Sequence, residues 1–161
     1  MSTAQAQAPA VVEKTIEFKP FGELESIKLS HSIVKAVVAR PTKSGVMPTD
    51  GDISKFIMLC KSRELNPFVG DAYLVGYDGN DGPEFSLITS VQALLKRAEA
   101  NPNFDGMESG IVVRAGDKTI ERPGNIIYPG ETLYGGWARL WRKDRTRVFY
   151  DALQLSTYNK G

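Results

Sequence analysis

The most basic window of this sequence covers residues 139–147, and aromatic side chains lie within and beside it. Its five cations are Arg139, Arg142, Lys143, Arg145 and Arg147. The aromatic residues nearest to them are Trp137, Trp141, Phe149 and Tyr150. Rings beside cations suit single-stranded nucleic acid, because bases stack on the rings while phosphates meet the charges. The window therefore predicts a contact with single-stranded nucleic acid.

Strand periodicity sharpens this prediction. Alternate side chains of a strand share one face, so Trp137, Arg139 and Trp141 are expected to project together. Only one acid, Asp144, opposes the five cations. The alternative interpretation is a solvated hairpin tip with the two tryptophans in the core behind it. Composition alone leaves both interpretations open.

A second candidate cation, Lys96, falls on a helix expected over residues 91–100. It shares the polar side of that helix with Gln92 and Glu99, while the apolar stripe consists of Val91, Leu94, Leu95 and Ala98. A solvated helix face is the alternative interpretation of this side. Arg97 sits nearer to the apolar stripe, where its stem is expected to lie along apolar surface.

Several kinds of chemistry find no support in the sequence. It contains no Gly-x-x-x-x-Gly-Lys-Ser/Thr loop, which argues against ATP hydrolysis. His31 is the only histidine, with no Cys or His companions for zinc and no serine and acid arranged around it in sequence. Cys60 is expected to be a small buried hydrophobe. We therefore expect that the protein is not an enzyme and that it binds neither a metal ion nor a cofactor.

Length and composition favour one compact domain. The chain has 161 residues, of which 42% are hydrophobic, and a net charge of +1, so any nucleic-acid site depends on local clustering of charge. A single cysteine excludes an internal disulfide framework and fits a reducing compartment. The sequence has no run of eighteen apolar residues, so it predicts no membrane-spanning helix. We expect a flexible tail over residues 1–20, which is not a signal peptide, and one α+β core over residues 21–161.

The first half of that core is expected to carry two helices. Apolar residues at helical spacing predict a helix over residues 27–40, stopped by Pro41. Thr49 and Asp52 have the spacing of a capping box. The helix that follows is expected to run to about residue 64 and to bury Ile53, Phe56, Ile57 and Cys60.

The remainder is expected to supply two hairpins and a third helix. Strands over residues 72–77 and 85–89 flank a turn rich in Gly, Asp and Asn, and Ser90 can cap the helix over residues 91–100. The turn is not a calcium loop, because it fails the EF-hand template. Shorter strands are expected over residues 107–115 and 126–128. Residues 133–142 and 147–155 are expected to form the second hairpin.

Four landmarks in order over residues 49–151 resemble the RecT/Redβ (Bet) family of phage-type single-strand annealing proteins. They are Leu65-Asn66-Pro67-Phe68, Ala72-Tyr73-Leu74, Phe104-Asp105-Gly106 and Arg142-Lys143-Asp144-Arg145. The first and third are expected to have structural roles. Family members commonly carry a basic residue near Lys96, so the resemblance implies a phosphate contact there. Members continue with a further C-terminal helix, so the resemblance implies a chain shortened at that end.

The resemblance implies a Rad52-like fold, in which helices back a small antiparallel sheet. It also implies ATP-independent binding of single-stranded DNA and annealing of complementary strands in phage-type homologous recombination. The expected partners are single-stranded DNA, the annealed duplex, further copies in a ring or helical filament, and a phage exonuclease. The expected location is the cytoplasm of a bacterial or phage-infected cell. Two alternatives remain open: a general single-strand binder without annealing activity, and a structural or protein-interaction domain.

Overall fold

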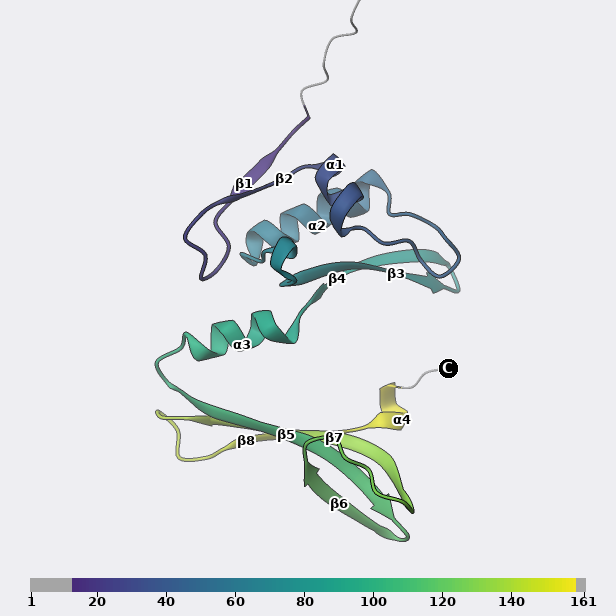
Figure 1. The fold of residues 1–161 in the computed structure, drawn as a ribbon, viewed down its shortest axis with the longest axis vertical. Coiled ribbons are helices and arrows are strands. Elements are labelled where there is room, and N and C mark those ends of the chain that lie inside the picture. Colours follow the sequence, from purple (N-terminus) through teal and green to yellow (C-terminus); the bar gives the residue numbers. More distant parts are fainter. Residues whose placement is uncertain (1–12, 159–161) are drawn as a thin grey trace, which may run out of the picture. The chain divides into compact units, whose positions relative to one another are not determined.

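A computed structural model describes residues 13–158 (Figure 1). Contacts divide the chain into two compact units, Met1–Arg97 and Ala98–Gly161, where the sequence analysis expects one core over residues 21–161. Strand β1 (Ile16–Phe18) lies inside the expected tail, and Phe18 is buried. Order therefore begins before residue 20, contrary to the prediction. Residues 1–12 of that tail lie outside the described residues.

The helix expected over residues 27–40 is wrong in its first four residues. Residues Ile27–Leu29 form strand β2, which pairs antiparallel with β1. Ser30 then begins a helix, because its Oγ accepts a hydrogen bond from the amide of Ile33 (3.3 Å). Helix α1 (His31–Ile33) continues into a π-helix, η1 (Val34–Val38). The serine side chain thus separates a strand from a helix in a segment whose apolar spacing suggested one helix.

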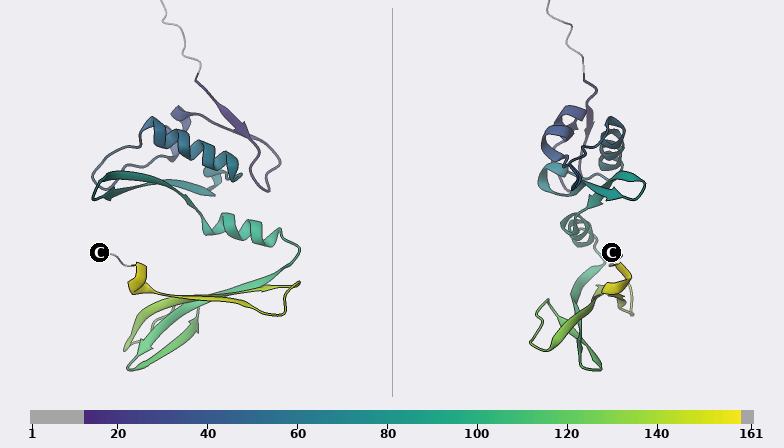
Figure 2. Two further views of the ribbon diagram at one scale, coloured as in Figure 1. Left: turned by 180° about the vertical axis from the view of Figure 1, so that it is seen from behind. Right: turned by 90° about the vertical axis from the view of Figure 1, so that its right-hand side faces the viewer.

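Helix α2 (Asp50–Ser62) confirms the predicted capping box. The amide of Asp52 donates to Thr49 Oγ1 (3.2 Å), and the amide of Thr49 donates to Asp52 Oδ2 (2.9 Å). The expected apolar face is buried, with Phe56 and Ile57 at 1% and 2% exposure. The helix lies on one face of a hairpin and shares a core with Leu74, Phe85 and Leu87 (Figures 1 and 2).

That hairpin consists of β3 (Ala72–Gly79) and β4 (Gly82–Thr89), both longer than expected. Before it, Asn66 caps a short 3₁₀ helix, η2 (Pro67–Val69), which ends at Gly70 with a φ of 81°. After it, Ser90 caps helix α3 (Val91–Glu99), as predicted, by accepting from the amide of Ala93 (3.1 Å). The expected apolar stripe of α3 is wrong in part: Val91 and Leu94 are exposed, whereas Leu95 and Ala98 are half-buried. Ala93, outside the expected stripe, is buried.

The second unit is built on a four-stranded antiparallel sheet of order β6-β5-β7-β8. Its strands are β5 (Phe104–Ala115), β6 (Lys118–Pro123), β7 (Glu131–Arg142) and β8 (Phe149–Gln154), followed by helix α4 (Leu155–Tyr158). The strand expected over residues 126–128 is wrong: these residues form a loop, and the partners of β5 are β6 and β7. The predicted α+β class is confirmed, with helices and antiparallel strands throughout.

Candidate nucleic-acid interface

The predicted basic hairpin is formed by β7, β8 and the connecting loop of residues 143–148. The amide of Lys143 donates to the carbonyl of Asn103 (2.9 Å), which ties the loop to the start of β5. The amide of Arg145 donates to the carbonyl of Arg142 (3.2 Å), which closes a turn. Backbone contacts therefore position the loop, and most of its side chains remain exposed.

Arg142 is paired within its own loop. Its Nε and Nη2 donate to the two carboxylate oxygens of Asp144 (2.8 and 2.7 Å). The same bonds raise the pKa of Arg142 and lower the pKa of Asp144. The Arg-x-Asp spacing in a turn is the signal by which the sequence could have shown this pairing. A phosphate at Arg142 must compete with a bidentate carboxylate.

Arg139 is ion-paired with an acid that no sequence pattern indicated. Its Nη2 donates to Glu121 Oε2 (2.7 Å), and its guanidinium lies 4.6 Å from the ring centre of Trp137. The Tyr150 hydroxyl donates to the same carboxylate, which raises the pKa of Tyr150. Glu121 comes from β6, two strands away, so no local pattern indicates it.

The two tryptophans have different surroundings. Trp137 is buried and pairs across the sheet with Gly110, where a Cβ atom would stand 2.9 Å from the indole ring. The guanidinium of Arg139 lies over this ring, which confirms that Trp137 and Arg139 share a face. Trp141, by contrast, is only half-buried. Trp137 therefore belongs to the core of the second unit, and Trp141 keeps a surface that a base could reach.

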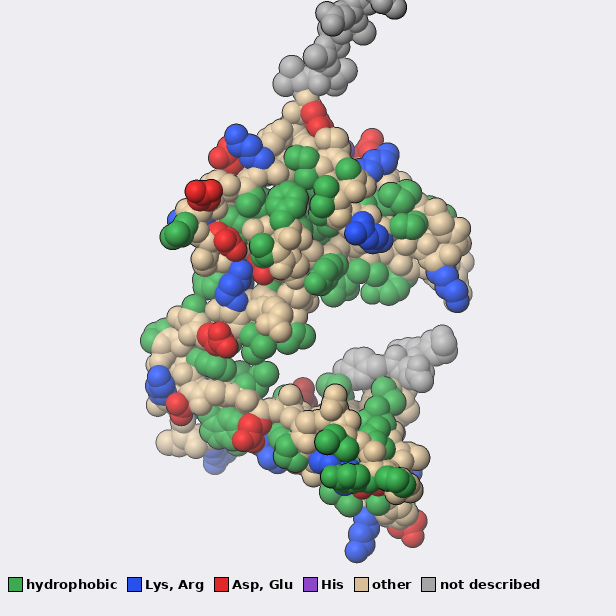
Figure 3. All heavy atoms as spheres, in the orientation of Figure 1, with side chains coloured by type: hydrophobic (Ala, Val, Ile, Leu, Met, Phe, Trp, Pro, Cys, Tyr) green, Lys and Arg blue, Asp and Glu red, His purple; other side chains and the backbone are tan. Residues whose placement is uncertain are grey.

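Three cations of the window are exposed and form no ion pair with any described carboxylate: Lys143, Arg145 and Arg147. Arg145 and Arg147 line a shallow pocket of about 260 Å³ together with the half-exposed ring of Phe149. Elsewhere charges of both signs are interspersed, as Figure 3 shows for one face. The loop thus combines uncompensated positive charge with an accessible aromatic ring.

Lys96 belongs to the other unit and is ion-paired. Its Nζ lies 3.1 Å from Asp71 Oδ2 and 3.8 Å from Glu23 Oε1. Asp71 is buried and also accepts a hydrogen bond from the amide of Asn66 (3.0 Å). Lys96 is therefore the counter-ion of a buried carboxylate. Its expected phosphate contact stays a prediction.

His31 has neighbours that the sequence did not indicate. Its Nε2 lies 2.8 Å from Ser54 Oγ, and its Nδ1 lies 4.0 Å from Asp50 Oδ1. Ser54 sits inside the regular helix α2, and the Asp50 side chain is 81% exposed. In a serine triad a buried acid orients the histidine, and oxyanion donors lie beside the serine. Asp50 is too exposed to serve as that acid, so we interpret the His31–Ser54 contact as a clamp between α1 and α2.

Residues 13–158 contain no group of three or more His, Cys, Asp or Glu side chains that could hold a metal ion. In the same range, no helix has both the length and the apolar character needed to cross a membrane.

Comparisons with known proteins address the family. No curated protein matches the chain. The sequence model of the RecT family matches residues 31–161, which includes every described element from α1 to α4 and the whole basic hairpin. On this match the chain belongs to the RecT family.

Proposed function

We propose that this protein binds single-stranded DNA and anneals complementary strands without ATP, in phage-type recombination. Membership of the RecT family over residues 31–161 is the observation that carries this proposal. In this proposal the protein binds the strands and is not an enzyme, because base pairing between the strands forms the annealed duplex. Its expected partners are further copies of the chain and a phage exonuclease, in the cytoplasm of a bacterial or phage-infected cell.

The 143–148 loop is the proposed contact with the DNA backbone. Annealing brings two lines of phosphates together, and cations that neutralise them lower the repulsion. Lys143, Arg145 and Arg147 are suited to this role because no described carboxylate competes for them. Phosphates carry no sequence information, so the contact is sequence-neutral, as annealing of arbitrary strands requires.

Exposed aromatic rings are the proposed contact with the bases. Phe149 and Tyr150 are about half exposed, and Trp141 is half-buried beside the loop. Stacking on such rings tolerates every base, because each base has an aromatic face. Arg139 and Arg142 are assigned secondary roles, since each already forms an ion pair at 2.7 Å.

The test is annealing of complementary oligonucleotides by the full chain in the absence of ATP. The variant Lys143→Gln, Arg145→Gln, Arg147→Gln should weaken binding to all sequences alike and slow annealing. The slope of log K against log salt should flatten by about 0.7 for each phosphate that the variant no longer neutralises. The matched control is Lys55→Gln, Lys61→Gln, Arg63→Gln, which removes three exposed cations from α2 and from the residue after it.

The two variants separate the outcomes. If both lower affinity equally, net charge and not the loop governs binding, and the proposed site is wrong. If wild-type protein binds oligonucleotides but does not accelerate annealing, the protein is a general single-strand binder. If it does not bind at low salt, the interaction-domain alternative replaces both.

A further inference from the structure

An apolar groove runs along the free edge of β3 in the first unit. It has a volume of about 570 Å³, and five consecutive residues of β3, from Ala72 to Gly76, line it. No residue of β4 contributes to the lining. A pocket on a face of the hairpin would meet alternate residues of both strands. The groove therefore follows the edge of β3 that points away from β4.

The register of the hairpin determines which backbone groups face the groove. Asp78 pairs with Pro83, and proline has no N–H to give to a neighbouring strand, so this is a non-hydrogen-bonded pair. Such pairs alternate with hydrogen-bonded ones along an antiparallel ladder. Ala72, Leu74 and Gly76 therefore turn their N–H and C=O groups outward. Within residues 13–158 no other element pairs with this edge.

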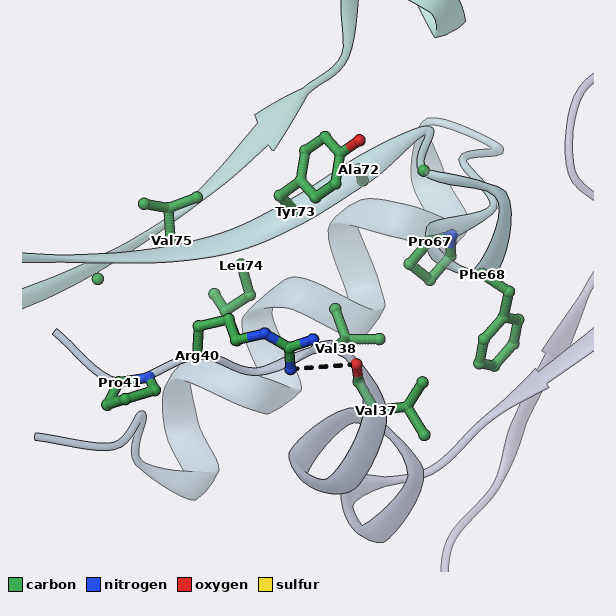
Figure 4. Close-up of a pocket in the computed structure, with 12 residues that line it drawn as sticks. Val37, Val38, Arg40, Pro41, Pro67, Phe68, Ala72, Tyr73, Leu74 and Val75 are labelled. Atoms are coloured by element: carbon green, nitrogen blue, oxygen red, sulfur yellow. Dashed lines mark hydrogen bonds between the residues drawn. The ribbon is translucent and has the colours of Figure 1, made fainter. Parts of the chain in front are cut away.

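The walls of the groove are apolar and carry one charge. Val37, Val38 and Pro41 form one wall, and Phe68 and Tyr73 lie toward the end nearest η2. In Figure 4, Tyr73 and Val75 project to one side of β3, and Leu74 projects to the other.

The charge is that of Arg40. Its Nη1 donates to the carbonyls of Ala39 (3.0 Å) and Val37 (3.4 Å), the second bond being drawn in Figure 4. No carboxylate among residues 13–158 forms an ion pair with Arg40. An occupant of the groove that carries a carboxylate would therefore complement this guanidinium.

We propose that this groove binds an extended, apolar peptide segment of a partner protein, which adds as a third strand beside β3 and places a carboxylate against Arg40. Unpaired strand edges accept peptides in this way: main-chain hydrogen bonds supply affinity, and pockets for alternate side chains supply specificity. Five residues of strand span about 14 Å, room for four or five peptide residues.

A nucleic-acid strand fits this groove less well than a peptide does. Several successive phosphates need several cations, and Arg40 is the one charged residue among the described residues that line the groove. The alternating N–H and C=O groups of a strand edge match a peptide backbone, residue by residue. The proposed peptide site is thus chemically distinct from the proposed DNA contact in the 143–148 loop.

Amide hydrogen exchange of the full chain, measured by NMR, tests the proposal. In the free protein the amides of Leu74 and Gly76 should exchange fast, while those of Tyr73 and Val75, which face β4, should be protected. The probe is a short acetylated peptide of alternating valine and threonine with a free C-terminal carboxylate. Its addition should slow exchange at Leu74 and Gly76 by about tenfold or more.

Three matched comparisons define the contact. A peptide N-methylated at alternate residues should lose binding, because it cannot donate to the strand edge. A peptide with an amidated C-terminus should bind more weakly than the free acid. Arg40→Gln should abolish that preference for the free acid while leaving the melting temperature close to that of the wild type.

Other occupants give other results, and each overturns the proposal. Without peptide, protection of the Leu74 and Gly76 amides that rises with protein concentration identifies a second copy of the chain. Protection that is independent of protein concentration identifies a segment of the same chain. Protection by an oligo-dT strand but not by the peptide identifies a nucleic-acid groove. Absence of any effect of the peptide at millimolar concentration leaves β3 as a solvated edge. None of these results alters the annealing test.

Discussion

The ammonium group of Lys96 lies 3.1 Å from Oδ2 of Asp71, a carboxylate whose side chain is only 6% exposed. Asp71 sits between η2 and β3, and its backbone carbonyl accepts from the amide of Ser90, which caps α3. The pair therefore links the start of the hairpin to the helix that follows it. A cation that the sequence marks as a candidate phosphate contact is also a structural tie.

Lys96→Gln should lower the free energy of unfolding, because it leaves a buried carboxylate without its counter-ion. Loss of one partner of a fully buried pair costs about 3–5 kcal/mol, and we expect about 2–3 kcal/mol because Lys96 keeps some exposure to solvent. Urea unfolding measures this decrease. The salt slope of single-stranded DNA binding by the folded variant tests the predicted phosphate contact separately: a slope flatter by about 0.7 supports it, and an unchanged slope leaves Lys96 as a counter-ion only. Unchanged stability would contradict the structural role.

Substitution of the two tryptophans should affect different properties, stability for Trp137 and DNA binding for Trp141. Trp137→Ala should cost about 3–5 kcal/mol of stability, because the ring is buried over Gly110. Trp141→Ala should leave stability nearly unchanged and weaken binding of single-stranded DNA by about 1–3 kcal/mol, with the salt slope intact, because a base can no longer stack there. Melting curves and titrations at several salt concentrations distinguish the two. Equal loss of stability in both variants would place Trp141 in the core.

Gly110→Ala should destabilise the second unit through overpacking. A Cβ at Gly110 would stand 2.0 Å from the carbonyl oxygen of Arg122, so a neighbouring strand must shift. We expect a loss of about 3 kcal/mol, at the upper end of overpacking penalties. Ser109→Ala is the matched control, because the Ser109 side chain is exposed on the same strand. Similar unfolding curves for the two variants would show that the sheet relaxes around this position.

Ionised Glu131 should stabilise the second unit, and this stabilisation should be lost at acidic pH. Its bidentate pairing with Arg122 and the hydrogen bond from the amide of Tyr128 lower its pKa from 4.5 to about 2. The folded-state pKa lies below the unfolded one, so the stabilisation is complete above about pH 4.5 and is lost as pH falls toward 2. Denaturation at a series of pH values should therefore show the wild type approaching Glu131→Gln in stability within this range. A constant difference between the two proteins would contradict the assignment.

Phe56→Ala should cost about 3–5 kcal/mol, because the ring is 1% exposed between α2 and the β3–β4 hairpin. Met58→Ala, on the exposed side of the same helix, should change the free energy of unfolding little. Calorimetric melting of the two variants measures the contrast. A small effect of Phe56→Ala would mean that the core repacks around the missing ring.

The sequence by itself determined the elements whose signals are local. Thr49 and Asp52 mark the start of α2 because the capping bonds join residues three apart, and Ser90 marks the start of α3 in the same way. The apolar face of α2 follows from helical periodicity, and the β3–β4 hairpin follows from its turn residues. The order of the four landmarks predicted the family, and the match over residues 31–161 confirms that prediction.

Only the tertiary structure decided which of the candidate charges remain unpaired. Glu121 reaches Arg139 across the sheet, and Asp71 reaches Lys96 over 25 residues of chain, so neither pairing has a local signature. The same holds for burial: Trp137 is covered because Gly110 lies opposite it, a register set by the whole sheet. Helical spacing predicted that Val91 is buried, but its side chain is exposed. Composition shows how many charges a segment carries, whereas long-range packing determines which of them a ligand can reach.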